Sequence, residues 1–272
     1  MKDIIYSVAI MLNRFLHLNP VYRNDEEYEL KMRLEDPFYL ERFGYKVFSQ
    51  NDEDGIINEI FNRIGTTNKK FLEFGVGNGL ECNSHFLLHS GWSGLWIEGN
   101  KKHVKQMKTL FGKPFLEKRL SILNKFVTVN NINELIGMAG ITSQIDLLCI
   151  DIDGNDYWLW EAINCIEPRV VVVEYNAKFP PPYEWVMPYN PKHVWDGSDF
   201  YGASLEALDV LGKRLGYQLV GTSTKGINAF FVKKDLAESL FVTPASAIDL
   251  YNPYRLRYYL NNGHKSKKYT GQ

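Results

Sequence analysis

The sequence predicts an α/β fold with a doubly wound, mostly parallel seven-stranded sheet, an antiparallel edge strand and an N-terminal helical extension. From residue 70 onward, short apolar runs typical of strands alternate with segments of helical spacing, which indicates a parallel sheet covered on both faces. A glycine-rich turn follows the first strand. Only residues 223–227 separate the last two strands, and this link is too short for a parallel crossover.

The expected elements follow one another with short connections. Strands are expected at 70–74, 94–97, 125–129, 145–150, 169–175, 217–222 and 228–233. Helices are expected at 56–64, 81–90, 101–111, 132–138, 157–163 and 204–215. The run at 145–150 is apolar except for Asp146, and the run at 169–175 contains four consecutive valines, so both strands are expected to be buried on both faces.

Length and composition suit one generous domain with extra segments. The chain has 272 residues, of which 45% are hydrophobic, and its net charge of -1 gives no sign of a nucleic-acid partner. Three scattered cysteines fit a reducing cytosol, so a cytoplasmic location is expected. The apolar run at 4–12 is too short to span a membrane. We expect a helical extension at 1–45, a main domain at 46–235, and a C-terminal extension with a basic tail at 236–272.

Three glycines and two carboxylates predict a ligand site at the first two strand ends. Gly75, Gly77 and Gly79 let the backbone turn sharply and let a ligand lie against the main chain. Glu73, just before them, would repel a pyrophosphate but attract the amino group and sulfonium of S-adenosylmethionine. Glu98, at the second strand end, can accept both hydroxyls of a ribose. The alternative is a tight strand-to-helix turn without a ligand.

On these residues the chain resembles the class I, Rossmann-like, S-adenosylmethionine-dependent methyltransferases. The acidic glycine motif at 73–79 and Trp96-Ile97-Glu98 match that family's first two motifs, and the final hairpin matches its reversed last strand. The resemblance covers roughly residues 46–235, which it implies are a methyltransferase domain. The cofactor contacts expected from it are Gln50, Glu73, Gly75, Gly77, Gly79, Glu98, Asn130, Asn131 and Asp151. Many relatives carry Asp where this chain has the two asparagines.

More narrowly, the runs at 49–55, 150–157 and 174–176 resemble a bacterial group associated with surface-polysaccharide gene clusters and distantly like the FkbM-type O-methyltransferases. This resemblance implies methylation of a hydroxyl on a sugar or surface-glycan precursor, as in capsule or polysaccharide biosynthesis. The alternatives are another small acceptor, such as a phosphate-linked or lipid intermediate, and a non-catalytic cofactor-binding partner subunit. Whether the chain forms a homo-oligomer is left open.

Polar side chains at the next two strand ends predict the reaction site. Asp151 and Asp153 follow the fourth strand, and Glu174 and Asn176 end the fifth, so all four should meet in one crevice. Carboxylate and amide oxygens suit Mg²⁺ or Mn²⁺, and some methyltransferases that the chain resembles hold a metal there. The alternative is that Asp153 and Asp156 only cap the helix that starts at Tyr157. Asp151 is the first candidate for the base that takes the acceptor's proton, and His193 is the second.

The segment 176–203 is expected to be an acceptor lid. It contains five prolines, which exclude a long helix or central strand, and seven Phe, Tyr or Trp residues. Aromatic rings pack against the apolar faces of sugars, and Trp185, Trp195 and Tyr201 are the expected acceptor contacts. The alternative is that these rings only cover the sheet edge.

Overall fold

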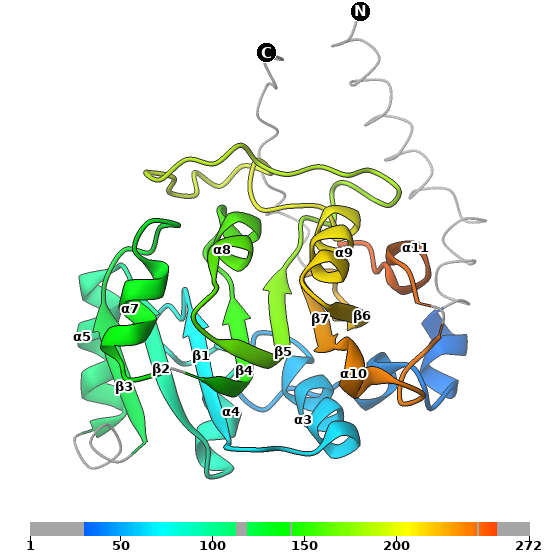
Figure 1. Ribbon diagram of the computed structural model, residues 1–272, viewed down its shortest axis with the longest axis horizontal. Helices are drawn as coiled ribbons and strands as arrows, with labels where there is room; N and C mark the ends of the chain where they lie inside the picture. The colour runs from blue at the N-terminus through cyan, green and yellow to red at the C-terminus, as the bar shows by residue number, and fades with distance from the viewer. Residues whose placement is uncertain (1–29, 113–118, 142, 244, 255–272) are drawn as a thin grey trace, which may run out of the picture.

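The structure of the protein is a computed structural model that describes residues 30–112, 119–141, 143–243 and 245–254 (Figure 1). The apolar run near the N-terminus and the basic tail after residue 254 lie outside these residues. Within the described ranges, no helix combines the length and the apolar character needed to cross a membrane.

The core of the molecule is a seven-stranded sheet in the order β3-β2-β1-β4-β5-β7-β6. The strands are β1 (Lys70–Phe74), β2 (Ser93–Glu98), β3 (Leu120–Asn124), β4 (Gln144–Ile150), β5 (Glu167–Glu174), β6 (Tyr217–Thr222) and β7 (Asn228–Lys233). All neighbouring strands pair in parallel except β7, which is antiparallel to both β5 and β6. The predicted fold class is confirmed, and the reversed strand lies one position in from the edge.

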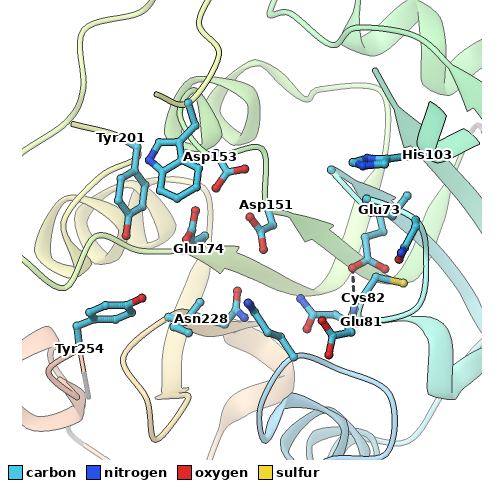
Figure 2. A pocket seen from close by; sticks show the side chains of 18 residues that line it. Glu73, Glu81, Cys82, His103, Asp151, Asp153, Glu174, Tyr201, Asn228 and Tyr254 are labelled. Atoms are coloured by element: carbon cyan, nitrogen blue, oxygen red, sulfur yellow. Dashed lines mark hydrogen bonds between the residues drawn. The ribbon is translucent and has the colours of Figure 1, made fainter. Parts of the chain in front are cut away.

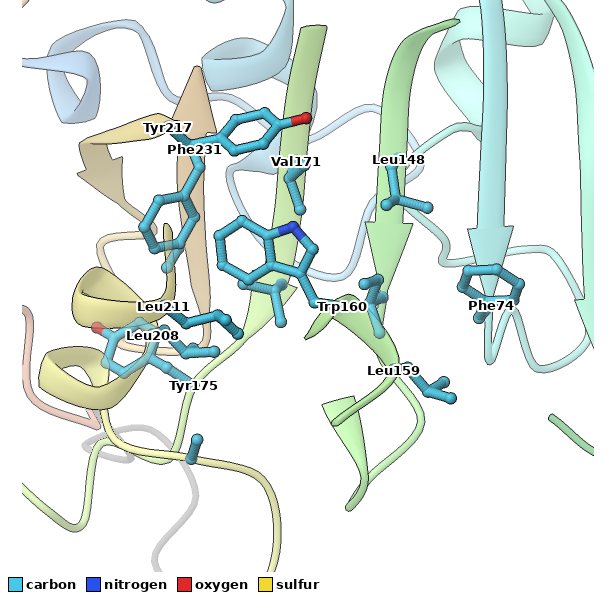
Figure 3. Packing of buried hydrophobic residues seen from close by; sticks show 14 of the residues in the cluster. Phe74, Leu148, Leu159, Trp160, Val171, Tyr175, Leu208, Leu211, Tyr217 and Phe231 are labelled. Atoms are coloured by element: carbon cyan, nitrogen blue, oxygen red, sulfur yellow. The ribbon is translucent and has the colours of Figure 1, made fainter. Parts of the chain in front are cut away.

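Helices cover both faces of this sheet, as the alternating strand pattern requires. They are η1 (Leu40–Phe43), α3 (Glu53–Ile64), α4 (His85–His89), α5 (Lys101–Leu110), α7 (Ile132–Met138), α8 (Asp156–Ala162), α9 (Leu205–Arg214), α10 (Lys234–Ala237) and α11 (Ala247–Leu250). Val171 and Val173 of β5 pack on the face under α7, α8 and α9, whereas Val170 and Val172 pack on the face under α3, α4 and α5. Figure 3 shows the first of these clusters around Trp160.

The third strand was predicted at 125–129, and this position is wrong. The strand is β3, five residues earlier, where Leu120 pairs with Gly94 and Asn124 pairs with Glu98. Because β2 ends at Glu98, residues after Asn124 extend beyond the sheet and have no partner strand there. The valines at 127 and 129 have strong strand propensity, but pairing outweighs propensity.

The helix expected at 81–90 is reduced to α4, because residues 80–84 turn back toward β1. The segment 176–203 contains no helix or strand, as expected, and Val186 forms an isolated bridge with Ala203. In Figure 1 this segment crosses above the carboxyl ends of β4 and β5.

A buried carboxylate at the opposite end of the sheet joins β4, β5 and the loop before β1. Asp146 accepts hydrogen bonds from the backbone nitrogens of Thr67, Asn68 and Lys69 at 2.9, 3.0 and 2.7 Å, and from Nη1 of Arg169 at 2.8 Å. Burial alone would raise the pKa of Asp146, but the hydrogen bonds from Arg169 and Thr67 outweigh it and hold the pKa below its ordinary value.

Replacing this carboxylate by Asp146→Asn should lower the free energy of unfolding by about 3 kcal/mol at neutral pH, since Arg169 would stay buried without its charged partner. Because the folded pKa lies below the unfolded value of about 4, the stabilisation is complete above that value and is lost as the pH falls through the folded pKa. Urea denaturation at a series of pH values should show the gap closing only in acid. The exposed pair Glu167–Lys233 supplies a control, Glu167→Gln, which should leave the unfolding midpoint unchanged. Equal stability of Asp146→Asn and the wild type would contradict the assignment.

Candidate functional site

A cleft of about 440 Å³ opens at the carboxyl ends of the strands (Figure 2). It lies where β1 has β2 on one side and β4 on the other, so that the chain winds in opposite directions from this point. The cleft is lined by Gln50, Glu73, Gly75, Val76, Gly77, Asn78, Glu81, Cys82, Asn83, His103, Asp151, Asp153, Glu174, Trp195, Tyr201, Ile227, Asn228 and Tyr254. Of the predicted site residues, the structure brings together here Gln50, Glu73, Gly75, Gly77, Asp151, Asp153, Glu174, Trp195 and Tyr201.

The glycine turn after β1 is held directly against the turn after β4. Gly75, Gly77 and Gly79 have φ angles of 74°, 57° and 79°, in the left-handed region that favours glycine. A Cβ on Gly75 would lie 1.6 Å from the backbone oxygen of Asp151. Gly79 is not among the residues that line the cleft. It makes room for the ring of Trp96 instead, since a Cβ on Gly79 would lie 2.7 Å from that ring.

Glu73 reaches the cleft, but the chain that follows the glycine turn holds its carboxylate. The two oxygens accept the backbone nitrogens of Asn83 and Ser84 at 2.8 and 2.9 Å, and the Ser84 hydroxyl donates to one of them. Burial raises the pKa of Glu73. These bonds fold residues 80–84 back over β1, so Glu73 shapes the glycine turn as well as lining the cleft.

Glu98 also supports the turn. Its carboxylate accepts the backbone nitrogen of Gly77 at 2.9 Å and that of Asn100 at 2.6 Å. It stands behind the lining, which His103 completes at this end. Asn131 accepts from the backbone nitrogen of Thr128 at 2.8 Å, and both Asn130 and Asn131 lie outside the lining residues.

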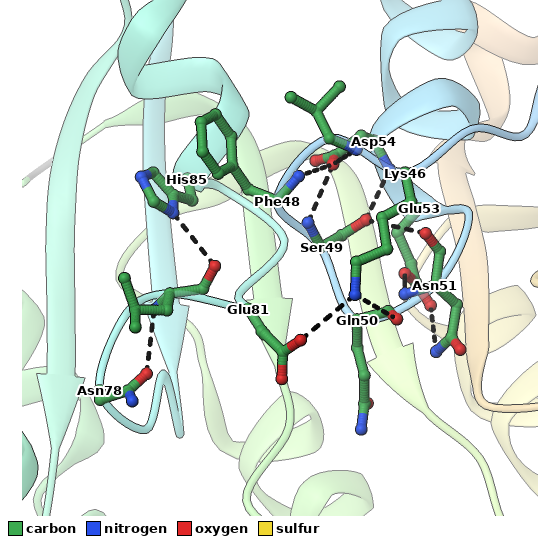
Figure 4. A network of polar contacts seen from close by, with 12 residues as sticks. Lys46, Phe48, Ser49, Gln50, Asn51, Glu53, Asp54, Asn78, Glu81 and His85 are labelled. Carbon is green, nitrogen blue, oxygen red and sulfur yellow. Dashed lines mark hydrogen bonds and ion pairs between the residues drawn. The ribbon is translucent and has the colours of Figure 1, made fainter.

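The segment before α3 forms the wall opposite the glycine turn (Figure 4). One oxygen of Asp54 accepts the backbone nitrogens of Val47, Phe48 and Ser49 at 2.7, 2.6 and 2.9 Å. The Lys46 amine contacts the Gln50 carbonyl at 3.1 Å and the Glu81 carboxylate at 3.2 Å. These bonds tie residues 46–50 to Asp54 in the first turn of α3 and to Glu81, and the segment presents Gln50 to the cleft.

Three carboxylates meet at the end of β4 and β5. Asp151, Asp153 and Glu174 each offer an oxygen, and these oxygens lie within 4.8 Å of one another. Burial, and then the charges of Asp153 and Asp156, raise the pKa of Asp151 well above its ordinary value. Burial, and then the charge of Asp151, do the same for Glu174. One Glu174 oxygen, Oε2, is buried and has no hydrogen-bond partner among the described residues. The cluster therefore needs protons or a cation.

Asn176, the fourth predicted ligand, uses its side chain to bind backbone groups instead. Its amide nitrogen donates to the carbonyls of Asp199 and Tyr201, both at 2.9 Å, and its oxygen accepts from the backbone of Lys178 at 3.1 Å. It therefore anchors the segment 176–203 to β5.

Two predicted side chains of that segment lie beside the cleft rather than in its lining. The His193 ring packs on the turn after β4, with Nε2 3.0 Å from the Asp153 carbonyl oxygen. Trp185 stacks on Phe179 with ring centroids 4.2 Å apart. Trp195 and Tyr201 line the cleft and meet edge to face at 6.4 Å.

Sequence reasoning missed Asn228 and Tyr254. Asn228 begins β7 and pairs with Glu174, so the predicted reversal of the last hairpin was the signal that could have found it. Tyr254 belongs to the C-terminal extension, which the Tyr175 hydroxyl holds by donating to the Asn252 carbonyl at 2.6 Å. The sequence carries no local signal for that contact.

No protein-family model matches the chain, and no curated protein matches its sequence. Solved structures do match. The O-methyltransferase TomG from Streptomyces achromogenes, in complex with S-adenosylmethionine, is 15% identical with a TM-score of 0.43, over 73% of this chain and 87% of that chain. An S-adenosylmethionine-dependent methyltransferase from Clostridium acetobutylicum is 12% identical with a TM-score of 0.40, over 79% and 99%. One from Aquifex aeolicus is 14% identical with a TM-score of 0.39, over 76% and 98%.

The contact between the two turns gives a matched pair of variants. Gly75→Ala should lower the free energy of unfolding by at least about 3 kcal/mol, because a left-handed residue and a backbone clash must both be relieved. Gly77→Ala should cost only about 1–2 kcal/mol, since its Cβ would meet open space and only the left-handed conformation is unfavourable. Urea denaturation measures both. Equal losses would show that the close approach of Gly75 is not a constraint.

Proposed function

We propose that this chain is an S-adenosylmethionine-dependent methyltransferase that acts on a hydroxyl of a sugar or surface-glycan precursor. The observation that carries the proposal is the contact of Gly75 with the Asp151 backbone, which joins a glycine turn to a cluster of carboxylates in one cleft. A ligand on the turn would have its reactive end beside acids that can receive a proton.

The cleft suits a cationic ligand. Its volume is within the range of small-molecule sites. Glu73, Glu81 and Asp151 give its wall negative charge, and none of the described lining residues is Lys or Arg. A pyrophosphate would be repelled there, whereas a sulfonium and an amino group are attracted. Glu98 would bind the ribose, since each carboxylate oxygen that accepts one backbone nitrogen keeps a second lone pair.

In the proposed reaction the acceptor oxygen forms a bond to the methyl carbon as the carbon–sulfur bond breaks, which leaves S-adenosylhomocysteine. The hydroxyl proton passes to Asp151, the first candidate base. The alternative role of Asp151 is that of a metal ligand: with Asp153 and Glu174 it would hold Mg²⁺ or Mn²⁺, for which the unpartnered oxygen of Glu174 is suited. A cation there would lower the pKa of the acceptor hydroxyl.

The acceptor would lie under the segment 176–203, against Trp195 and Tyr201. Nε1 of Trp195 donates to the Ser198 carbonyl at 2.7 Å, which fixes the indole as a platform. Aromatic faces pack against the apolar faces of sugars, and the carboxylates can order hydroxyls. Because the described lining lacks Lys and Arg, a phosphate-linked acceptor fits the cleft less well than a neutral sugar.

Calorimetry should show saturable S-adenosylmethionine binding that Glu98→Ala weakens by about 1–3 kcal/mol, through the lost ribose hydrogen bonds and the loosened glycine turn. The matched control is Glu134→Ala, which removes an exposed carboxylate on α7 outside the cleft. Its affinity should stay within about threefold of the wild type, less than 1 kcal/mol. Tight binding of NADH without binding of S-adenosylmethionine would contradict the proposed cofactor.

Asp151→Asn should reduce methyl transfer to a panel of neutral sugars and oligosaccharides by at least about 100-fold, because the amide cannot take the hydroxyl proton. Radiolabelled S-adenosylmethionine gives the measurement. With Asp151 as the base and divalent cations removed by EDTA, wild-type turnover should increase with pH through the raised pKa of Asp151 as its carboxylate ionises. His193→Gln should retain most of the turnover, since the His193 ring lies outside the cleft lining. Full activity in Asp151→Asn would exclude Asp151 as the base.

A further inference from the structure

Asn228 and Glu174 present two unsatisfied oxygens side by side. They are directly opposed on the antiparallel strands β5 and β7, and both line the cleft. Opposed residues of such a pair project their side chains on the same face, a few ångströms apart. Oδ1 of Asn228 and Oε2 of Glu174 are each buried without a hydrogen-bond partner among the described residues. The Asn228 residue is only 3% exposed, so water reaches it poorly.

Glu53 dictates which way the Asn228 amide faces. Nδ2 of Asn228 donates to Oε1 of Glu53 at 3.1 Å, and Oε2 of Glu53 accepts the backbone nitrogen of Asn51 at 2.8 Å. Glu53 is fully buried at the start of α3. Both Glu53 oxygens act as acceptors, since Oε1 also lies 3.4 Å from Nδ2 of Asn51, so the reversed Asn228 amide would set two acceptor oxygens against each other. The amide oxygen of Asn228 is therefore directed away from Glu53, and Figure 2 shows the Asn228 side chain below Glu174 and Asp151.

We infer that Asn228 is the neutral oxygen ligand of a divalent cation held by Asp151, Asp153 and Glu174, and that Glu53 is its positioning residue. Since it concerns the same cation, this assignment rests on the proposed function. It gives the amide role to Asn228 rather than to Asn176, whose side chain is used by the backbone of the segment 176–203.

The chemistry of the four oxygens favours a cation over a proton. A proton on Oε2 of Glu174 could be donated to Oδ1 of Asn228 and so satisfy both oxygens. It would not relieve the repulsion between the carboxylates of Asp151 and Asp153. Mg²⁺ and Mn²⁺ prefer several hard oxygen ligands, and a neutral amide adds a ligand without further negative charge. The start of α3 then has a defined function, because through Glu53 it fixes a side chain of the reaction site.

The test is Mn²⁺ binding to the full chain without S-adenosylmethionine, followed by the electron paramagnetic resonance signal of the free ion. Asn228→Ala should weaken binding by about tenfold or more, and Glu53→Gln by a smaller factor, because glutamine permits either amide orientation. Water-proton relaxation at saturating Mn²⁺ should show one additional bound water in Asn228→Ala. Glu134→Gln, which removes an exposed carboxylate on α7 outside the cleft, should keep the Mn²⁺ affinity within about twofold of the wild type.

Thermal unfolding of every variant checks the fold, and Asn228→Ser replaces Asn228→Ala where the latter does not fold. If Asn228→Ala binds Mn²⁺ as tightly as the wild type, with the same number of bound waters, the assignment of Asn228 is wrong. If the wild type binds no Mn²⁺, the proposal of a cation site is wrong, and the ligand roles of Asn228 and the three carboxylates are wrong with it. Calorimetry of S-adenosylmethionine would still decide the cofactor separately.

Discussion

The close approach of Gly75 to the Asp151 carbonyl is the constraint on which the site depends. There is no room for a side chain between the two turns, so the ends of β1 and β4 meet through their backbones. As a result, a ligand bound along the glycine turn lies next to the carboxylates that follow β4. At the other end of the sheet, Asp146 and Arg169 hold β4, β5 and the entry to β1 together. The register of β1 and β4 is thus constrained at both ends of the sheet, and that of β5 at the Asp146 end.

The fold could be predicted largely because its signals are local. The valines of β5 and the apolar run of β4 identify buried central strands without knowledge of their neighbours. The position of β3 could not be predicted from propensity, because it is decided by where β2 ends at Glu98. The insertion of β7 between β5 and β6 also depends on pairing between distant segments.

In the candidate site, too, positions set by local signals could be predicted, whereas positions set by contacts between distant segments could not. Residues at strand ends, such as Asp151 and Glu174, could be expected to converge, because parallel strands bring their carboxyl ends to one edge. Asn176 lies two residues farther on, where its direction depends on the path of a long proline-rich loop. Asn228 enters the cleft from the amino end of a reversed strand, so its place follows only from the pairing of β7 with β5.

The segment before α3 connects the two ends of the cleft physically. On one side the Lys46 amine holds the Glu81 carboxylate beside the glycine turn, and on the other Glu53 holds Asn228 beside the carboxylate cluster. Asp54 fixes the loop between them by accepting three consecutive backbone nitrogens. The two proposed parts of the site, for cofactor and for acceptor, are therefore supported by hydrogen bonds to the same stretch of chain.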